Sequence, residues 1–402
     1  MPINTDTLFR EEYSKLVAIY CHKYGTHHID LIEDAIQDTF YKAAQQWPEQ
    51  TPEKPRAWIY AVSKNSLLDK IKGIKDTTAP EEALQDWTDE PMNDYEIKDN
   101  KLKMLFACCH PELGVNDQLL LSLKFLCGFG NRQIARVLLK SHSAIEKASN
   151  RAKQRFQALV SSLEVPALSV LKERLDAVLK VIYLQFTEGY KQTEGDQLLN
   201  KELCFDSIKL AELIASFKEL EGNKVNALLA LMYFQASRLD ARLDENGNQL
   251  AFEKQDRSQW NYHYIMQGNI YLSRSAIGPE LSLYHLEAAI ASYYAVAETY
   301  EETNWTAIFD LYQRALELSP NPWYRLNMLI AYSKIRSPED CLESTLIVEN
   351  ELPKSHYTQI FIGDLLQASK KTSEARIRYL RALELTSNDG ERKFIQEKLA
   401  SL

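Results

Sequence analysis

Cys108, Cys109 and His110 stand side by side in LFACCHPELG (105–114), and these residue types can bind a metal or form a redox pair. Adjacent residues of a helix point about 100° apart, so the three side chains cannot easily share one ion. Zinc sites usually combine two closely spaced cysteines with a distant second pair, whereas the remaining cysteines are scattered singly. We interpret the stretch as the apolar end of a helix closed by Pro111, and we expect no metal or cofactor there.

A second group of polar residues lies in the C-terminal half, where charged side chains adjoin aromatic ones. It comprises Glu188, Tyr190, Asp256, Arg257 and Trp260. No nucleophile with an attendant base, no glycine-rich phosphate loop and no paired metal-ligand motif accompanies these residues in the sequence. We therefore expect them to fix helix packing or to form a contact between domains, and we expect no catalytic residues in the protein.

The third group is basic and occurs in residues 125–157, FLCGFGNRQIARVLLKSHSAIEKASNRAKQRFQ. A short helix after glycines, a tight turn and a longer polar helix are the pattern of a helix-turn-helix. From Arg132 to Arg155 there are seven basic residues against Glu146 alone. Phosphate contact needs such charge, and base reading needs polar side chains near the start of the second helix. The alternative is a solvated basic face on an ordinary helical hairpin.

A further basic stretch, EKPRAWIYAVSKNSLLDKIKGIK (53–75), has six Lys or Arg residues against Glu53 and Asp69. Trp58 and Tyr60 are interleaved with this charge, and binding a single DNA strand requires aromatic stacking beside phosphate-binding lysines. A tryptophan at helical spacing is more often part of a core, so we expect Trp58 to be largely buried.

These residues must be positioned by helices, because apolar side chains recur at i, i+3 and i+4 along nearly the whole chain. We predict an all-α protein with two small helical modules and a C-terminal helical domain ending in helix hairpins. RALEL occurs at 314–318 and 381–385, with VENEL at 348–352 between them, and the steps of 34 and 33 residues match the tetratricopeptide period. The predicted divisions are 1–75, an acidic linker at 76–101, a second module at 102–160, a helical extension at 168–275 and tetratricopeptide-like repeats at 276–402.

The net charge of −9 is distributed unevenly along the chain. Residues 1–160 have a balance of −1, but residues 76–100 hold nine acidic residues and one lysine, so the rest of this part is basic. A basic surface is suited to nucleic acid, which the overall charge would disfavour. Unpatterned cysteines, the lack of a signal-like start and the lack of a long apolar run predict a cytoplasmic protein without a membrane segment.

Two basic helical modules joined by an acidic tether resemble an extracytoplasmic-function sigma factor of bacterial RNA polymerase. Region 2 of that family resembles residues 8–75, where EDAIQDTFYKAAQQW is similar to the polymerase-docking helix and PRAWIYAVSKNSLLDKIK to the minus-ten-reading helix. Region 4 resembles residues 102–158. LFACCHPELG, QFTEGY (185–190), KQDRSQWNYHYIMQG (254–268) and GPELSLYHLEAAIASYYA (278–295) are similar to the subgroup whose long C-terminal extension ends in tetratricopeptide-like repeats.

The resemblance implies core RNA polymerase and promoter DNA as partners, and a regulatory extension with a possible protein partner for its repeats. Polymerase binding would fall to Asp34, Gln37, Asp38 and Phe40, of which the first three share a helix face by their spacing. The minus-ten strand would fall to Lys64, Asn65, Lys70 and Lys72. The minus-thirty-five duplex would fall to Arg132, Ser143, Lys147, Asn150, Arg151 and Lys153.

Two other functions fit parts of the sequence. One is a helix-turn-helix regulator with a ligand- or protein-sensing helical domain, which would bind duplex DNA as a dimer. The other is a repeat scaffold that binds only proteins. In-vitro transcription with core polymerase separates the three, because a sigma factor alone confers promoter-specific initiation.

Overall fold

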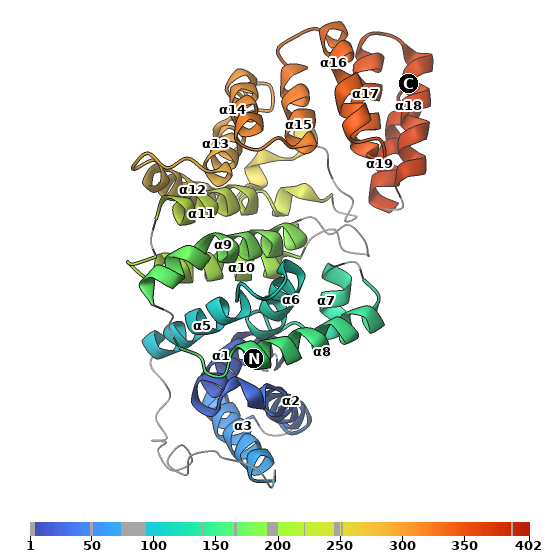
Figure 1. Cartoon of the computed structure of the whole chain (residues 1–402). Helices are drawn as coiled ribbons and strands as arrows, with labels where there is room; N and C mark the ends of the chain where they lie inside the picture. The colour runs from blue at the N-terminus through green and yellow to red at the C-terminus, as the bar shows by residue number, and fades with distance from the viewer. Residues whose placement is uncertain are drawn as a thin grey trace. The chain divides into compact units, whose positions relative to one another are not determined.

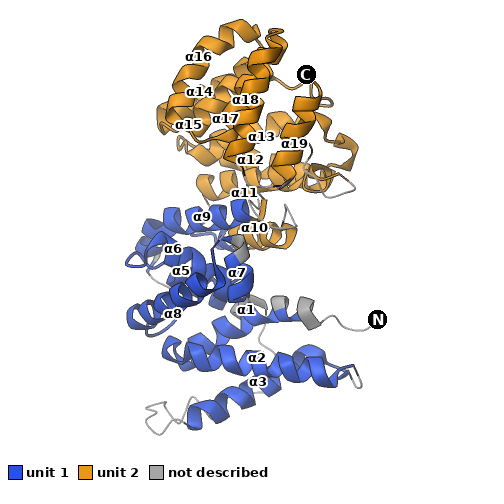
Figure 2. Cartoon of the chain, turned by 90° about the vertical axis from the view of Figure 1, so that its right-hand side faces the viewer, with its two compact units in different colours: residues 1–188, 212–220 blue, residues 189–211, 221–402 orange. Residues whose placement is uncertain are grey.

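The computed structural model describes residues 5–48, 51–73, 94–138, 140–164, 167–190, 200–220, 222–244, 250, 252–386 and 389–402. The regular secondary structure of these residues is helical throughout, which confirms the predicted all-α class. The chain divides into two compact units (Figure 2). Unit 1 comprises residues 1–188 and 212–220, and unit 2 comprises residues 189–211 and 221–402.

Unit 1 contains both basic stretches. Its helices in chain order are α1 (Thr5–Tyr24), η1 (Thr26–His28), α2 (Ile29–Gln46), α3 (Pro55–Lys72), α5 (Asp94–Cys108), α6 (Val115–Phe125), α7 (Asn131–Val137) and α8 (His142–Leu159). Two further helices cross the division between the units, namely α9 (Leu168–Tyr190) and α10 (Lys201–Ala215). The separate modules expected at 1–75 and 102–160 thus lie in one compact unit, together with most of α9.

The core of unit 1 is organised around α1, which packs against α2, α5 and α6 (Figure 1). The apolar stripe expected on this helix is buried, and Leu16, Val17 and Tyr20 have no exposed surface. The Tyr20 hydroxyl lies 2.7 Å from the Ser63 hydroxyl of α3, so the one polar atom of this ring is satisfied inside the core. A buried hydroxyl without such a partner would destabilise the fold.

Local sequence signals set the ends of several helices in unit 1. Helix α3 begins at Pro55 and ends before Gly73, as the sequence predicts. Helix α8 begins after Ser141, whose hydroxyl accepts a hydrogen bond from the Ala144 amide at 3.2 Å, and this N-cap satisfies a donor that the first turn leaves free. Residues 94–101 of the predicted acidic linker belong to α5, while residues 76–93 lie outside the described residues.

Unit 2 continues the chain as packed helices and short 3-10 turns. Its elements after α10 are α11 (Asn223–Ala236), η2 (Asp240–Arg242), η3 (Phe252–Lys254), η4 (Arg257–Gln259), α12 (Tyr262–Ser275), α13 (Leu283–Val296), α14 (Trp305–Leu318), α15 (Pro322–Tyr332), α16 (Pro338–Glu351), α17 (His356–Ala368), α18 (Thr372–Leu385) and α19 (Asp389–Ala400). From α13 onward each helix packs against the next along the chain (Figure 1).

The last six helices form three hairpins with a regular residue step. Equivalent buried positions on α14, α16 and α18 are Ile308 and Ala315, Cys341 and Val348, and Ala375 and Ala382. They are separated by 33 residues and then by 34 residues, so Val348 corresponds to Ala315 and to Ala382. Aligning VENEL with the two RALEL strings gives the steps in the opposite order, because the letter match places this repeat one residue too late.

Within the described residues, every helix is too short or too polar to cross a membrane.

Candidate nucleic-acid interface

Four of the six residues expected to contact duplex DNA from α7 and α8 lie together on the outer side of α8. Ser143, Lys147, Asn150 and Arg151 are all exposed. The opposite side of α8 is buried through Ile145, Ser149, Ala152 and Phe156. Packing against α6 and α7 therefore holds the helix so that its polar face meets solvent, which is the placement that a recognition helix requires. The fifth residue, Arg132, is exposed on α7.

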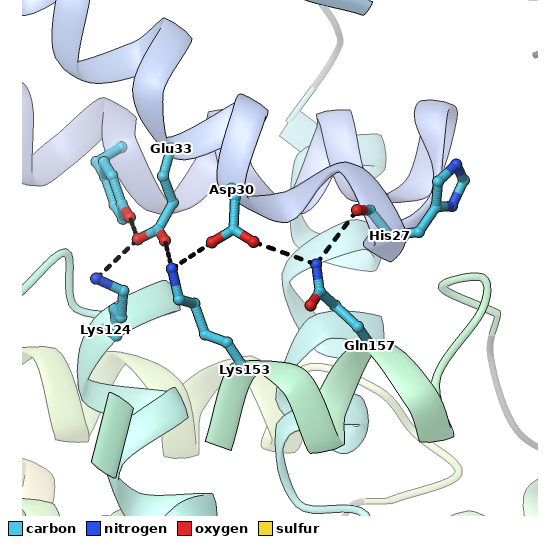
Figure 3. Close-up of polar contacts among 7 residues, drawn as sticks. His27, Asp30, Glu33, Lys124, Lys153 and Gln157 are labelled. Atoms are coloured by element: carbon cyan, nitrogen blue, oxygen red, sulfur yellow. Dashed lines mark hydrogen bonds and ion pairs between the residues drawn. The ribbon is translucent and has the colours of Figure 1, made fainter. Parts of the chain in front are cut away.

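Lys153, the sixth residue, is engaged inside unit 1. Its ammonium group pairs with Asp30 and lies 3.0 Å from Oε2 of Glu33, both on α2 (Figure 3). The side chain of Lys153 is only 14% exposed. Burial alone lowers the pKa of Lys153, but Glu33 and Asp30 outweigh it, and the net pKa is raised. The charge of Lys153 is thus already matched by two carboxylates of the same chain.

Glu33 is the centre of this cluster. Its Oε1 lies 2.9 Å from Nζ of Lys124 on α6, and it also accepts a hydrogen bond of 2.9 Å from the Tyr13 hydroxyl on α1 (Figure 3). Burial and the adjacent Glu33 carboxylate raise the pKa of Tyr13 well above its ordinary value, so Tyr13 remains a donor. Four helices therefore converge on one carboxylate whose side chain is 5% exposed.

The residues expected on the minus-ten side lie on α3 and differ in exposure. Asn65 and Lys72 are exposed, whereas Lys64 and Lys70 are partly buried. Trp58 is partly buried and packs edge to face on Trp47, with ring centroids 5.5 Å apart, so it contributes to packing as the sequence indicates. Asn65 and Lys72 are the members of this set most accessible to a DNA strand.

The expected polymerase-docking residues divide into a surface group and a core residue. Asp34, Gln37 and Asp38 are exposed on α2, in agreement with their helical spacing. Phe40 is 8% exposed and packs edge to face on Phe9 at 4.9 Å, so in this structure it holds α2 against α1. The acidic surface of α2 is therefore formed by the first three residues.

The Cys-Cys-His stretch is placed at the end of α5. Cys108 and Cys109 have no exposed surface, and burial raises the pKa of Cys109 to about 12, partly offset by a hydrogen bond from Ser122. Thiols in this state are poor nucleophiles and poor ligands, because both roles use the thiolate. In the described residues no three His, Cys, Asp or Glu side chains are grouped to hold a metal ion.

The five residues singled out in the extension take part in a connected set of contacts or adjoin it. Glu188, in unit 1, is half-buried, and burial raises its pKa. In unit 2, Asp256 caps η4 through the Ser258 amide at 2.9 Å. Arg257 donates hydrogen bonds to the backbone oxygens of Tyr294 and Ala297, at 2.7 Å and 2.5 Å. It also lies over the ring of Trp260, 4.8 Å from the centroid.

Arginines and rings alternate around Tyr190 in unit 2, and we call this set the arginine–aromatic ladder. Arg242 lies 3.9 Å from the Tyr190 ring centroid, and Arg238 donates a hydrogen bond of 2.6 Å to the Tyr190 hydroxyl. Arg238 in turn lies 4.8 Å from the Phe252 centroid, and Arg257 lies 5.5 Å from the same ring. Such cation–π contacts stabilise packing, so the ladder ties the end of α9 to α11, η3 and η4.

Sequence reasoning missed Asp30, Glu33 and Lys124, although one signal for two of them is present. Glu33 stands among the buried positions of α2, between Ile32 and Ile36, and Lys124 interrupts the apolar run LLLSLKFLC. An ionisable side chain at an apolar position requires a charged partner. The pattern indicates that such partners exist, but it does not identify them.

Comparisons with known proteins agree with this architecture. Residues 9–76 match Sigma-70 region 2, and residues 174–276 match a family of unknown function, DUF6596. An uncharacterized protein of Rhizobium meliloti (strain 1021) is 34% identical over 384 residues, which cover 93% of this chain and 90% of that protein. The region 2 match covers α1 to α3, and the second match lies in the C-terminal part. The chain therefore belongs to the sigma-70 family, as a factor with a C-terminal extension, and it shares its overall organisation with the Rhizobium meliloti protein.

Proposed function

We propose that the protein is an alternative sigma factor of the extracytoplasmic-function group, which binds core RNA polymerase and directs it to specific promoters. Its sigma-70 region 2 already assigns it to transcription initiation. The observation that carries the finer proposal is that the same compact unit also holds a helix-turn-helix with a polar, exposed α8 face. A factor that reads two promoter elements needs both parts.

The proposed reading of the minus-thirty-five duplex rests on Ser143, Lys147, Asn150 and Arg151. Lysine and arginine on this face supply phosphate contacts, while serine and asparagine can bond base edges in a major groove. Arg132 on α7 adds a cation at the edge of the same module. Asn65 and Lys72 on α3, with Lys64 and Lys70 beside them, would hold the opened minus-ten strand.

Polymerase docking is proposed for the acidic face of α2, formed by Asp34, Gln37 and Asp38. The three side chains are exposed on one side of a helix whose other side is buried through Ile32 and Ile36. A rigid helix with fixed charges suits an interface in which complementary charge sets the rate and orientation of association. Phe40 would act indirectly, by keeping α2 in place.

We also propose that the extension, residues 168–402, regulates access of the sigma modules to polymerase or promoter, with a positive role. Its hairpins have the residue step of tetratricopeptide repeats, an architecture suited to binding a protein or peptide. Glu188, Tyr190, Asp256, Arg257 and Trp260 are the proposed contact residues. Replacing Arg257 by lysine keeps the charge but loses the two backbone contacts, and should lower transcription more than Arg274→Lys, a matched change at an exposed position of unit 2.

Run-off transcription with purified core polymerase and genomic promoter fragments tests the main proposal. The wild-type chain should initiate at defined sites without another sigma factor, and the double variant Lys147→Ala, Arg151→Ala should lose this activity. Lys172→Ala, a matched loss of charge at an exposed position of α9, should not. Initiation that requires a second sigma factor would favour the helix-turn-helix regulator, and no effect on transcription would favour the scaffold.

A further inference from the structure

The helices of region 2 and the helix-turn-helix are joined along a continuous seam in unit 1. Besides the Lys153 contacts, Gln157 of α8 donates to the backbone oxygen of His27 at 3.2 Å and lies 3.4 Å from Oδ2 of Asp30 (Figure 3). Thr26 donates to the backbone oxygen of Val160, and Nδ1 of His22 lies 2.8 Å from the Leu163 oxygen. Packing of α1 against α5 and α6 adds apolar burial to the same seam.

The carboxylates of Asp30 and Glu33 take the position that DNA phosphates would take on Lys153. A lysine ammonium binds either anion by the same charge-assisted hydrogen bonds. Lys147 and Arg151 on the same helix are exposed, whereas Lys153 is enclosed by the start of α2. A DNA backbone that reached Lys153 would have to displace the two carboxylates.

The seam also fixes how far apart the two candidate DNA surfaces can be. Lys153 pairs with Asp30, and Lys70 on α3 pairs with Asp38. Asp30 and Asp38 lie on one helix about 12 Å apart along its axis, so the two ammonium groups are within about 25 Å of each other. Promoter elements named for positions ten and thirty-five are separated by roughly 85 Å of duplex at 3.4 Å per base pair. The arrangement of unit 1 cannot engage both elements at once.

We propose that this arrangement is a closed, autoinhibited state of the sigma modules, held by an ionic lock of Asp30, Glu33, Lys124 and Lys153. The inference rests on the proposed sigma function and concerns its regulation. Polymerase docking on the neighbouring acidic face of α2 competes with α8 for this end of the helix. Opening releases Lys153 for DNA and lets the helix-turn-helix move away from region 2, while residues 73–93 are long enough to span about 70 Å.

A reversible cross-link across the seam tests whether opening is required. Asp30→Cys combined with Gln157→Cys places two thiols where Gln157 and Asp30 now meet, and neither residue belongs to the proposed DNA or polymerase contacts. The six native cysteines are buried and should not compete for oxidation or for a short bis-maleimide. The cross-linked protein should lose more than tenfold of its promoter-specific transcription, and the disulfide form should recover on reduction. Full activity of the cross-linked protein would overturn the proposal.

A charge-swap series tests the lock itself, in the free full-length protein. Dyes at Ala61→Cys on α3 and Ala158→Cys on α8, both exposed positions, report the distance between the modules. Asp30→Lys should lower energy transfer by repelling Lys153, and adding Lys153→Glu should restore it with the wild-type net charge. Glu53→Lys, the same charge change at an exposed position before α3, should leave transfer unchanged. If Asp30→Lys behaves like Glu53→Lys, the ion pairs do not hold the seam.

The two experiments separate failure of the lock from failure of the sigma assignment. A wild-type chain that neither binds core polymerase nor initiates transcription refutes the proposed function, whatever the dyes report. A chain that is active while the distance stays constant from the free to the promoter-bound state refutes the lock alone.

Discussion

Lys70 of α3 and Asp38 of α2 form an ion pair, with 2.9 Å between Nζ and Oδ2. One residue is a candidate for the minus-ten strand and the other for polymerase docking, so the pair joins the two candidate surfaces of region 2. Their side chains are 31% and 54% exposed, and an exposed pair of this kind contributes at most about 1 kcal/mol. A DNA phosphate or a polymerase cation can therefore replace either partner at small cost.

The acidic face of α2 should respond to charge reversal. We expect Asp34→Arg to weaken binding to core polymerase about tenfold, because it places a cation on a surface that is proposed to meet one. Asp38→Arg should have a similar effect and should also release Lys70. Fluorescence anisotropy with labelled protein measures both affinities, and Glu53→Lys is the charge-matched control. Wild-type affinity of Asp34→Arg at an unchanged melting temperature would count against the docking assignment.

The two DNA surfaces should fail at different steps. Arg151→Ala should weaken binding to the minus-thirty-five duplex and reduce the slope of log affinity against log salt by about 1, since one phosphate contact is lost. Lys72→Ala should leave recruitment nearly intact and impair strand opening, which follows it. Filter binding across a salt series and permanganate footprinting distinguish the two. Normal melting by Lys72→Ala at saturating protein would contradict this division.

Unit 2 should lose stability in acid through Glu391 of α19. The carboxylate accepts a hydrogen bond of 2.6 Å from Tyr357 and one of 2.5 Å from Thr386, and it lies 3.0 Å from Nε2 of His356. Burial alone raises the pKa of Glu391, but these partners outweigh it and lower the pKa from 4.5 to about 2. A lowered pKa stabilises the fold above the unfolded value and ceases to do so as pH falls through the folded value.

We therefore expect wild type to exceed Glu391→Gln in stability by about 1–2 kcal/mol at pH 5 and above, after allowance for solvent screening. The difference should shrink between pH 4.5 and pH 2. Urea unfolding of both proteins across this range measures it, and Glu384→Gln, at an exposed position of α18, is the control. A difference that does not depend on pH would show that the carboxylate charge is not the cause.

Gly363 of α17 should not tolerate a side chain. A Cβ at this position would lie 2.5 Å from Cε1 of Tyr379, whose ring is fully buried and whose hydroxyl bonds Asp364 at 2.7 Å and Gln367 at 2.9 Å. Because the ring cannot move without losing these bonds, Gly363→Ala should destabilise unit 2 by about 1–3 kcal/mol. Gly114→Ala, where a Cβ meets nothing within 4 Å, should be close to neutral. Thermal unfolding of the two variants gives the comparison.

The helices that carry the candidate site could be predicted because their signals are local. Pro55 and Gly73 delimit α3, and Ser141 caps α8, within a few residues of the features that they determine. The spacing of Asp34, Gln37 and Asp38 likewise predicted their shared exposure. These inferences need only the geometry of one helix.

The ion cluster could not be predicted in the same way, because its members come from distant parts of the chain. Glu33 and Lys153 are separated by 120 residues, and only the packing of α1, α2, α6 and α8 brings them together. Phe40 illustrates a related limit, since motif resemblance assigned it to a surface while its ring packs on Phe9. The repeat register was displaced by one residue because letter identity does not record which side of a helix is buried.

The arginine–aromatic ladder contains no group that titrates in mild acid, because guanidinium stays protonated and the rings of Tyr190 and Phe252 stay neutral. The Glu391 contacts between α17 and α19 lose their anion as the pH falls. Acid therefore weakens unit 2 from its last hairpin, while the part around α11 and η4 keeps its contacts. Resistance to protons is graded along the extension, strongest beside the sigma modules in the sequence and weakest at the far end of the repeats.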